Sequence, residues 1–153
     1  MLAGTLKKIA IRHESRAPME EITQAEITVE DGVTGDYRGK LLKKRQVTVL
    51  SVEAWALACA EVGEALPWTI RRSNLLVEGI SLQGTAGQLL HVGDAILEIS
   101  GETTPCQRME EAQSGLLSAL EPDCRGGVLC TVIQSGKTTV GDAVTLEVNL
   151  KKS

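Results

Sequence analysis

The chain has 153 residues, a length typical of one domain that can bury a full hydrophobic core. It has 16 basic and 20 acidic residues, a net charge of −4, no Phe, one Tyr and two Trp, so it lacks both the basic surplus and the stacking aromatics of broad nucleic-acid binders. We therefore expect one domain over residues 1–153, with an aliphatic core and no nucleic-acid partner.

The compartment and the thiol chemistry can also be predicted. Residues 1–8 lack the apolar run of a signal peptide, and no segment approaches the length of a membrane span, so a cytoplasmic protein without a membrane partner is expected. Reduced thiols follow from that compartment. The cysteines at positions 59, 106, 124 and 130 form no C-x-x-C pair, and the two histidines lie far apart in the sequence, which argues against a structural zinc site.

Strand patterns dominate the first third of the chain. Residues 6–11 predict a first strand, and residues 25–29 alternate apolar and polar side chains. The latter run continues into residues 31–36, which are dense in turn formers. Residues 46–50 resemble a further strand.

The first predicted helix follows directly. Ser51 is expected to open it and Gly63 to end it, and its apolar face carries Val52, Trp55, Ala56, Cys59 and Val62. Trp55 and Cys59 lie on that stripe, so we expect both to pack in the core. Residues 74–80 then read as a short strand or loop after the basic pair Arg71-Arg72.

The second half of the chain contains a short repeat and a second predicted helix. Val92-Gly93-Asp94-Ala95 recurs as Val140-Gly141-Asp142-Ala143, and each copy is expected to turn into a half-buried strand. The helix should run from Pro105 to about Leu120, although Gly115 disfavours its middle. Residues 128–133 are apolar on both faces and indicate a central strand. Together these patterns predict a mainly β, barrel-like or sandwich fold with about two helices.

One cysteine falls in the predicted first turn of the second helix. Thr104 is its expected N-cap, Pro105 suits the first helical position, and Gln107 would complete a capping box. Cys106 would then lie among unpaired backbone N–H groups, near Arg108, in surroundings that stabilise a thiolate. A thiolate is both a nucleophile and a metal ligand. A buried cysteine that only fills space is the alternative.

A series of short motifs extends over roughly residues 5 to 148. They are Gly32-Val33-Thr34-Gly35-Asp36, Arg45-Gln46-Val47-Thr48-Val49-Leu50, Arg72-Ser73-Asn74-Leu75, Gly93-Asp94-Ala95-Ile96-Leu97-Glu98-Ile99, Thr104-Pro105-Cys106-Gln107-Arg108-Met109, Arg125-Gly126-Gly127-Val128 and Val140-Gly141-Asp142. In this order they resemble the MOSC domain family, named for the C-terminal domain of molybdenum-cofactor sulfurase, and its short stand-alone bacterial members in particular.

That resemblance implies a barrel-like, strand-rich fold and a functional cysteine, which maps onto Cys106. In such proteins the cysteine is thought to carry sulfur as a persulfide or to bind the molybdenum of a pterin cofactor. A soft thiolate suits both roles. Related proteins, including the mitochondrial amidoxime-reducing component, reduce N-hydroxylated bases with a cysteine-bound molybdenum.

The pterin cofactor carries a phosphate, so the implied site should supply cations and backbone donors. Arg72 and Asn74 are the first candidates, because an arginine fork pairs with phosphate and an asparagine can hold a pterin edge. Thr103 and Thr104 are expected to hydrogen-bond near the thiol, although helix capping alone would explain Thr104. Candidates of second rank are Arg71, Lys40, Arg45 and Arg125. For each charged residue, a solvated surface position is the alternative.

Two further motif residues and one further cysteine have expected roles. Asp36 and Asp94 follow glycines and are expected to cap turns rather than to bind metal. Cys124 precedes the Arg125-Gly126-Gly127 motif and is read as structural, with a resolving-thiol role open if it lies near Cys106.

Three functions are compatible with these features. The first is a cofactor-binding or sulfur-handling domain in which Cys106 binds molybdenum, or receives sulfur from an external desulfurase, since no pyridoxal-phosphate site is evident in the sequence. The second is a molybdenum-dependent reductase of N-hydroxylated substrates that needs separate electron-transfer proteins. The third is a non-catalytic adaptor.

Overall fold

The computed structural model describes residues 2–14, 16–37 and 46–147. Its strands are β1 (Leu2–Ile11), β2 (Glu20–Ile22), β3 (Gln24–Thr28), β4 (Gly32–Val33), β5 (Val47–Ser51), β6 (Leu75–Glu78), β7 (Leu89–Val92), β8 (Ala95–Glu102), β9 (Val128–Gln134), β10 (Gly136–Thr139) and β11 (Ala143–Glu147). Its helices are α1 (Val52–Val62), α2 (Gln107–Ala112) and α3 (Leu116–Leu120), with the 3₁₀ turns η2 (Trp68–Arg71) and η3 (Pro122–Cys124). None of the helices in these ranges is long and apolar enough to cross a membrane.

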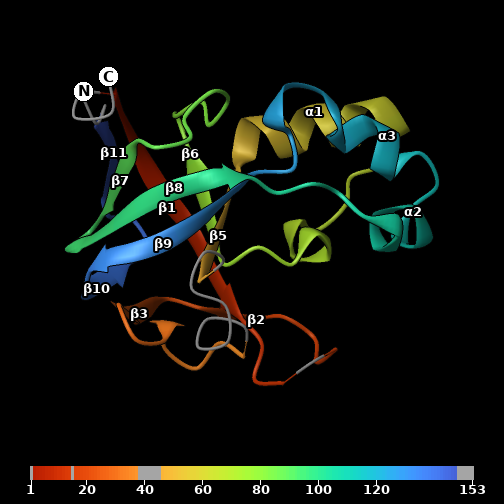
Figure 1. Ribbon diagram of the computed structural model, residues 1–153. Coiled ribbons are helices and arrows are strands. Elements are labelled where there is room, and N and C mark those ends of the chain that lie inside the picture. Colours follow the sequence, from red (N-terminus) through yellow and green to blue (C-terminus); the bar gives the residue numbers. More distant parts are fainter. Residues whose placement is uncertain (1, 15, 38–45, 148–153) are drawn as a thin grey trace.

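The described strands close into a barrel. They pair in the order β11-β7-β8-β9-β5-β6-β1, and β11 pairs with β1 as well, so that seven strands form a closed circuit. Strand β2 adds to the end of β1, opposite Ile9–Ile11. Strands β10, β3 and β4 form a small second sheet, and Figure 1 shows the helices gathered on the opposite side of the barrel. The predicted mainly β, barrel-like fold is confirmed.

Strands β5 and β6 and the last three residues of β1, Ile9–Ile11, are buried on both faces because two cores meet across them. One face fills the barrel, and the helices cover the other, which explains runs of apolar residues without alternation. The barrel core includes Ile9, Val49 and Leu75, whereas the neighbouring residues Ala10, Leu50 and Leu76 belong to the outer core, with Trp55, Met109 and Leu116 from the helices. The outer core holds α2 against the ends of the strands.

The predicted helix after Ser51 is confirmed as α1. The Ser51 hydroxyl accepts a hydrogen bond from the Ala54 backbone N–H at 3.1 Å, and Gly63 ends the helix with a φ of 74°. Strands β5 and β6 are parallel, so the chain must cross from the end of one to the start of the other. Helix α1 and turn η2 make that crossover, which carries Arg71 and Arg72 to the mouth of the barrel.

The second predicted helix is wrong in its start and its length. In place of one helix from Pro105 to about Leu120 there are two short helices, α2 and α3. Gly115 separates them with a φ of 89°, and the Glu110 carboxylate accepts hydrogen bonds from the backbone N–H groups of Gly115 and Leu117. These contacts cap α3 as a separate helix, so a single continuous axis is not formed.

The repeated Val-Gly-Asp-Ala motif makes two strand-to-strand turns, as predicted. Gly93 lies between β7 and β8 with a φ of 58°, and Gly141 lies between β10 and β11 with a φ of 101°. Both values lie in the left-handed region that glycine adopts most readily. The predicted central strand at 128–133 is β9, which pairs with both β5 and β8.

Candidate functional site

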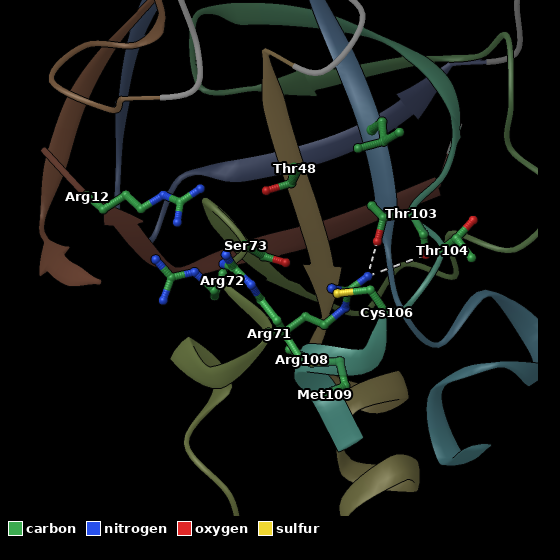
Figure 2. A pocket seen from close by; sticks show the side chains of 11 residues that line it. Arg12, Thr48, Arg71, Arg72, Ser73, Thr103, Thr104, Cys106, Arg108 and Met109 are labelled. Atoms are coloured by element: carbon green, nitrogen blue, oxygen red, sulfur yellow. Dashed lines mark hydrogen bonds between the residues drawn. The ribbon is translucent and has the colours of Figure 1, made fainter. Parts of the chain in front are cut away.

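A pocket of about 380 Å³ opens where β1, β5 and β9 meet η2 and the start of α2. Figure 2 shows Cys106, Thr103 and Thr104 at one side of it and Arg12 and Arg72 at the other. The full lining is Arg12, Thr48, Arg71, Arg72, Ser73, Thr103, Thr104, Cys106, Arg108, Met109 and Leu129. Four arginines and no acidic residue line it within the described part of the chain. This pocket contains four of the sequence-predicted site residues: Cys106, Arg72, Arg71 and Thr104.

Cys106 lies just before α2 and not in its first turn. It is the N-cap residue, its side chain makes no capping hydrogen bond, and its backbone is extended, with a φ of −125° and a ψ of 176°. The predicted N-cap Thr104 and its capping box with Gln107 are therefore wrong. The Cys106 thiol is exposed to the pocket. With a helix of only six residues, the positive surroundings of the thiol come from arginine side chains.

Arg71 keeps the segment before Cys106 extended. Its Nε donates a hydrogen bond to the Gly126 carbonyl at 3.0 Å, and its Nη2 donates to the hydroxyl and the carbonyl of Thr103. The Thr103 hydroxyl donates to the same Gly126 carbonyl at 2.9 Å. These contacts hold Thr103, three residues before the N-cap residue Cys106, next to Gly126. Arg71 thus lines the pocket and also supports the cysteine segment.

Arg12 is the most buried charge in the pocket, at 7% exposure. Its backbone N–H donates to the Asp36 carboxylate at 3.1 Å, but within the described residues its guanidinium donates no hydrogen bond. Burial lowers the pKa of the Arg12 guanidinium, and the positive charges of Arg72 and Arg108 lower it further, while Asp36 acts in the opposite direction. A buried cation with these neighbours favours an anionic ligand. Asp36 itself makes this long-range contact instead of the predicted local turn cap.

Arg72 adopts a backbone conformation that is rare for residues with a side chain. Its φ is 65° and its ψ is 34°, in the left-handed region. Such a position costs roughly 1–3 kcal/mol and is found mostly where the surroundings impose it. Its Nη2 donates to the Ala17 carbonyl at 2.9 Å, which ties the loop after β1 to the pocket.

Asn74 lies beside the pocket without lining it. Its side-chain carbonyl accepts from the Thr48 backbone N–H at 3.1 Å, and its amide donates to the Ala10 carbonyl at 3.2 Å. The side chain is buried at 5% exposure and links β1, β5 and the start of β6. These contacts give Asn74 a scaffold role. Its predicted contact with a pterin edge stays a prediction.

Arg125 and Cys124 line a different cavity, of about 470 Å³, bounded by α1 and the loop after β6. The Arg125 guanidinium pairs with the Glu61 carboxylate at 2.6 Å and donates to the Ala119 carbonyl, so it holds η3 against the helices. Burial is the main cause that raises the pKa of the Cys124 thiol, to about 11, followed by the charge of Glu102. All four cysteines are free thiols. Cys124 therefore lies outside the Cys106 pocket, and the predicted sites Lys40 and Arg45 lie outside the described residues.

Sequence reasoning missed Arg12 and Ser73 and left Arg108 out of the binding set. The position of Arg108, two residues after the cysteine on the same motif, was a usable signal. No local pattern distinguishes Arg12, because its burial depends on Asp36 and on the segments packed around it. Within the described residues, no three His, Cys, Asp or Glu side chains cluster closely enough to hold a metal ion by themselves.

Comparison with known proteins identifies the fold. A family model described as the MOSC domain matches residues 16–145. The YuaD protein of Bacillus subtilis superposes with a TM-score of 0.79 at 17% identity, over 97% of each chain. YiiM from Escherichia coli gives a TM-score of 0.73 at 17% identity, over 95% of this chain and 71% of its own. YiiM from Geobacillus stearothermophilus gives 0.68 at 14% identity, over 94% and 72%. No curated protein matches the sequence.

Proposed function

The chain belongs to the MOSC domain family, and from this premise we propose that the Cys106 pocket binds the molybdenum cofactor, with the Cys106 thiolate as the protein ligand of the metal. The family is associated with this cofactor. The observation that carries the proposal is the division of one pocket into an exposed thiol at one side and a buried, cationic side around Arg12. A ligand for such a pocket needs a centre that accepts a soft thiolate and a separate anionic group.

The residues present fit both parts of that cofactor. The pocket volume of about 380 Å³ falls within the range of small-molecule sites, roughly 300–1,000 Å³. The Arg12 guanidinium, which donates no hydrogen bond within the described residues, would pair with the phosphate, and Arg72 and Arg108 would add their charge. The Ser73 hydroxyl would donate to polar groups between the two sides.

The chemistry divides between the chain and the bound group. When bound, the cofactor supplies a metal that can exchange electrons and oxygen or sulfur atoms. Cys106 would hold the metal at the open side of the pocket, where a substrate or a partner protein can reach it. Arg71 keeps Thr103 and the segment up to Cys106 in place through its contacts with Gly126. The arginines would orient the phosphate so that the metal end faces the thiol.

The experiment measures molybdenum by elemental mass spectrometry in protein purified from a host that makes the pterin cofactor. We expect near-stoichiometric metal in the wild type, none in Cys106→Ser, and no change in the control Cys59→Ser, which alters a thiol on α1 outside the pocket. Metal in the wild type would lead to assays with N-hydroxylated substrates and added electron-transfer proteins. Absence of molybdenum from all three proteins would contradict the proposal.

A second candidate is persulfide transfer, which the exposure of Cys106 favours because an external donor can reach the thiol. The Cys106 thiolate would attack the outer sulfur of a donor persulfide, such as that of a desulfurase. A sulfur–sulfur bond forms on Cys106, the donor's own sulfur–sulfur bond breaks, and the donor leaves as a thiolate. Intact-mass analysis after incubation with a donor should show one added sulfur on wild type and on Cys59→Ser but none on Cys106→Ser. An unmodified wild type would exclude this candidate.

A further inference from the structure

Two buried polar side chains in the Cys106 pocket have no hydrogen-bond partner among the described residues. Ser73 is 2% exposed and Arg12 is 7% exposed, yet neither the Ser73 hydroxyl nor the Arg12 guanidinium makes a hydrogen bond within that part of the chain. Figure 2 shows Ser73 between Arg12 and Cys106. A buried polar group without a partner costs free energy, which a bound ligand offsets. Because both groups are donors, the ligand must carry acceptor oxygens, and the guanidinium favours an anion.

The rest of the lining restricts the chemistry of that anion. Arg71, Arg72 and Arg108 add positive charge, and none of the described lining residues is a carboxylic acid. The pocket therefore has no acidic side chain that could give a proton to a leaving group. A substrate whose leaving group departs as a stable anion suits this pocket better than an ester, whose alkoxide needs a proton.

We propose that the metal-free protein takes sulfur from a small oxyanion that carries a sulfane sulfur, of which thiosulfate is the simplest, and that Arg12 and Ser73 bind its sulfonate oxygens. The proposal rests on the persulfide candidate of the proposed function for the role of Cys106, and it names the class of the sulfur donor. A persulfide presented by a partner protein brings no sulfonate group, so it would leave Arg12 and Ser73 without a partner. Thiosulfate supplies the sulfur and the oxygens in one molecule.

The transfer is balanced without a further oxidant or reductant. The Cys106 thiolate attacks the outer sulfur of thiosulfate, a sulfur–sulfur bond forms on Cys106, and the sulfur–sulfur bond of thiosulfate breaks. The electron pair of that bond leaves with sulfite, which departs as a dianion whose charge the arginines stabilise. A thiolate or cyanide acceptor then attacks the outer sulfur of the Cys106 persulfide, takes that sulfur away and restores the thiolate.

The test uses full-length protein made in a host that lacks the pterin cofactor. Intact-mass analysis after incubation with thiosulfate should show one added sulfur on wild type and on Cys59→Ser, and none on Cys106→Ser. Thiocyanate should form when cyanide is added as the acceptor. Sulfate, an unreactive dianion, should slow the reaction with thiosulfate but not the alkylation of Cys106 by neutral iodoacetamide. A wild type that gains no sulfur from thiosulfate would overturn the proposal.

The Arg12→Gln variant separates anion binding from the reactivity of the thiol. It should lower the rate with thiosulfate about tenfold and alter the rate of Cys106 alkylation by iodoacetamide less than about twofold, because it removes a partner of the oxyanion and not the nucleophile. Lys137→Gln, which removes an exposed charge on β10, should react like the wild type with both reagents. An equal loss of rate with both reagents in Arg12→Gln would contradict the proposal.

The Ser73→Ala variant removes a hydroxyl that has no partner in the described structure. The midpoint of thermal unfolding should therefore stay the same or rise, while the rate with thiosulfate should fall about threefold. Ser118→Ala, at an exposed position on α3, should change neither quantity. A lower unfolding midpoint together with an unchanged thiosulfate rate in Ser73→Ala would assign the hydroxyl to the scaffold and refute its role in binding. This pair carries the test if Arg12→Gln does not fold.

The outcomes separate this proposal from the proposed function. Sulfur gained from a protein persulfide but not from thiosulfate supports the persulfide candidate and contradicts only the small-anion donor. Sulfur gained from thiosulfate, when protein from a host that makes the pterin cofactor carries no molybdenum, supports the donor proposed here and contradicts only the metal site.

Discussion

The backbone N–H of Arg12 donates a hydrogen bond to the Asp36 carboxylate over 3.1 Å, and both residues are buried. Asp36 opposes part of the guanidinium charge, whereas Arg72 and Arg108 add to the positive potential around it. The balance leaves this side of the pocket with a surplus of positive charge, which an anion can offset. The burial of Arg12 therefore leads directly to a prediction about anion binding.

Arg12→Gln should weaken the binding of inorganic phosphate by about tenfold, or about 1.4 kcal/mol. The reason is the loss of a desolvated guanidinium, whose charge-assisted hydrogen bonds are stronger than neutral ones. Titration calorimetry on metal-free protein measures the change. Arg12→Lys should retain part of the affinity, and Lys137→Gln should retain all of it. Unaltered phosphate affinity in Arg12→Gln would place the anion site elsewhere.

The four thiols should differ strongly in reactivity with iodoacetamide. Cys106 is exposed and Cys59 is partly exposed, whereas Cys124 and Cys130 are buried, and burial raises the pKa of both buried thiols. At mildly alkaline pH we expect Cys106 to be labelled first, Cys59 second and the other two only after unfolding. Peptide mapping by mass spectrometry gives the order. Early labelling of Cys124 would show that η3 opens in the native protein.

The sequence predicted what local chemistry determines and failed where distant contacts decide. Ser51 and Gly63 bound a helix because a hydroxyl cap and a left-handed glycine act within one turn. Thr104 also has a hydroxyl side chain that suits an N-cap, but Arg71 and Gly126 hold the adjacent Thr103 and keep the chain extended. Such long-range hydrogen bonds leave no periodic trace in the sequence.

The candidate site divides in the same way. Cys106 could be assigned because its motif resembles that of a family. Asn74 carried a family motif as well, yet its amide joins Thr48 and Ala10, residues far from it in the sequence. Arg12 could not be found, because its burial arises only when Asp36 and the strands around it come together.

Asn74→Ala should lower the free energy of unfolding by roughly 2–4 kcal/mol. The substitution leaves the Thr48 N–H and the Ala10 carbonyl without their side-chain partner in a buried place, and an unsatisfied buried group costs about 1–3 kcal/mol. Urea unfolding followed by circular dichroism measures the loss. Gln83→Ala, which removes one exposed contact to Asp123, should cost less than about 0.5 kcal/mol. Equal losses of unfolding free energy in the two variants would show that the buried Asn74 contacts stabilise the fold no more than an exposed contact does.

Cys124 should make the protein less stable in alkali. Its pKa is raised from 9.0 to about 11 in the folded state, so the unfolded thiol ionises first. The stabilisation is complete below pH 9 and is lost progressively between about pH 9 and pH 11, because the folded state there binds more protons than the unfolded one. Urea unfolding across this range, under reducing conditions, should give a smaller decline for Cys124→Ala than for wild type. An equal decline of the free energy of unfolding in both proteins would mean that Cys124 does not contribute to the loss of stability in alkali.

Gly127 should tolerate no side chain because a Cβ there has no room, and Gly84 serves as the matched control. Gly127 and Gly84 both have a positive φ, 94° and 71°, so alanine at either position carries similar backbone strain of about 1 kcal/mol. At Gly127, however, a Cβ would lie 2.3 Å from the Val49 carbonyl oxygen, whereas at Gly84 nothing lies within 4 Å.

Gly127→Ala must therefore push β9 away from β5, next to the carbonyl of Gly126 that Arg71 holds. We expect a loss of about 3 kcal/mol or more in the free energy of unfolding for Gly127→Ala and about 1 kcal/mol for Gly84→Ala, measured by urea unfolding. Gly126 and Thr103 support the segment that carries Cys106, so Gly127→Ala should also loosen the pocket. We expect either faster alkylation of Cys106 or weaker binding of phosphate. Equal stability losses in the two variants would show that the β5–β9 spacing can relax without cost, and that the pocket does not depend on it.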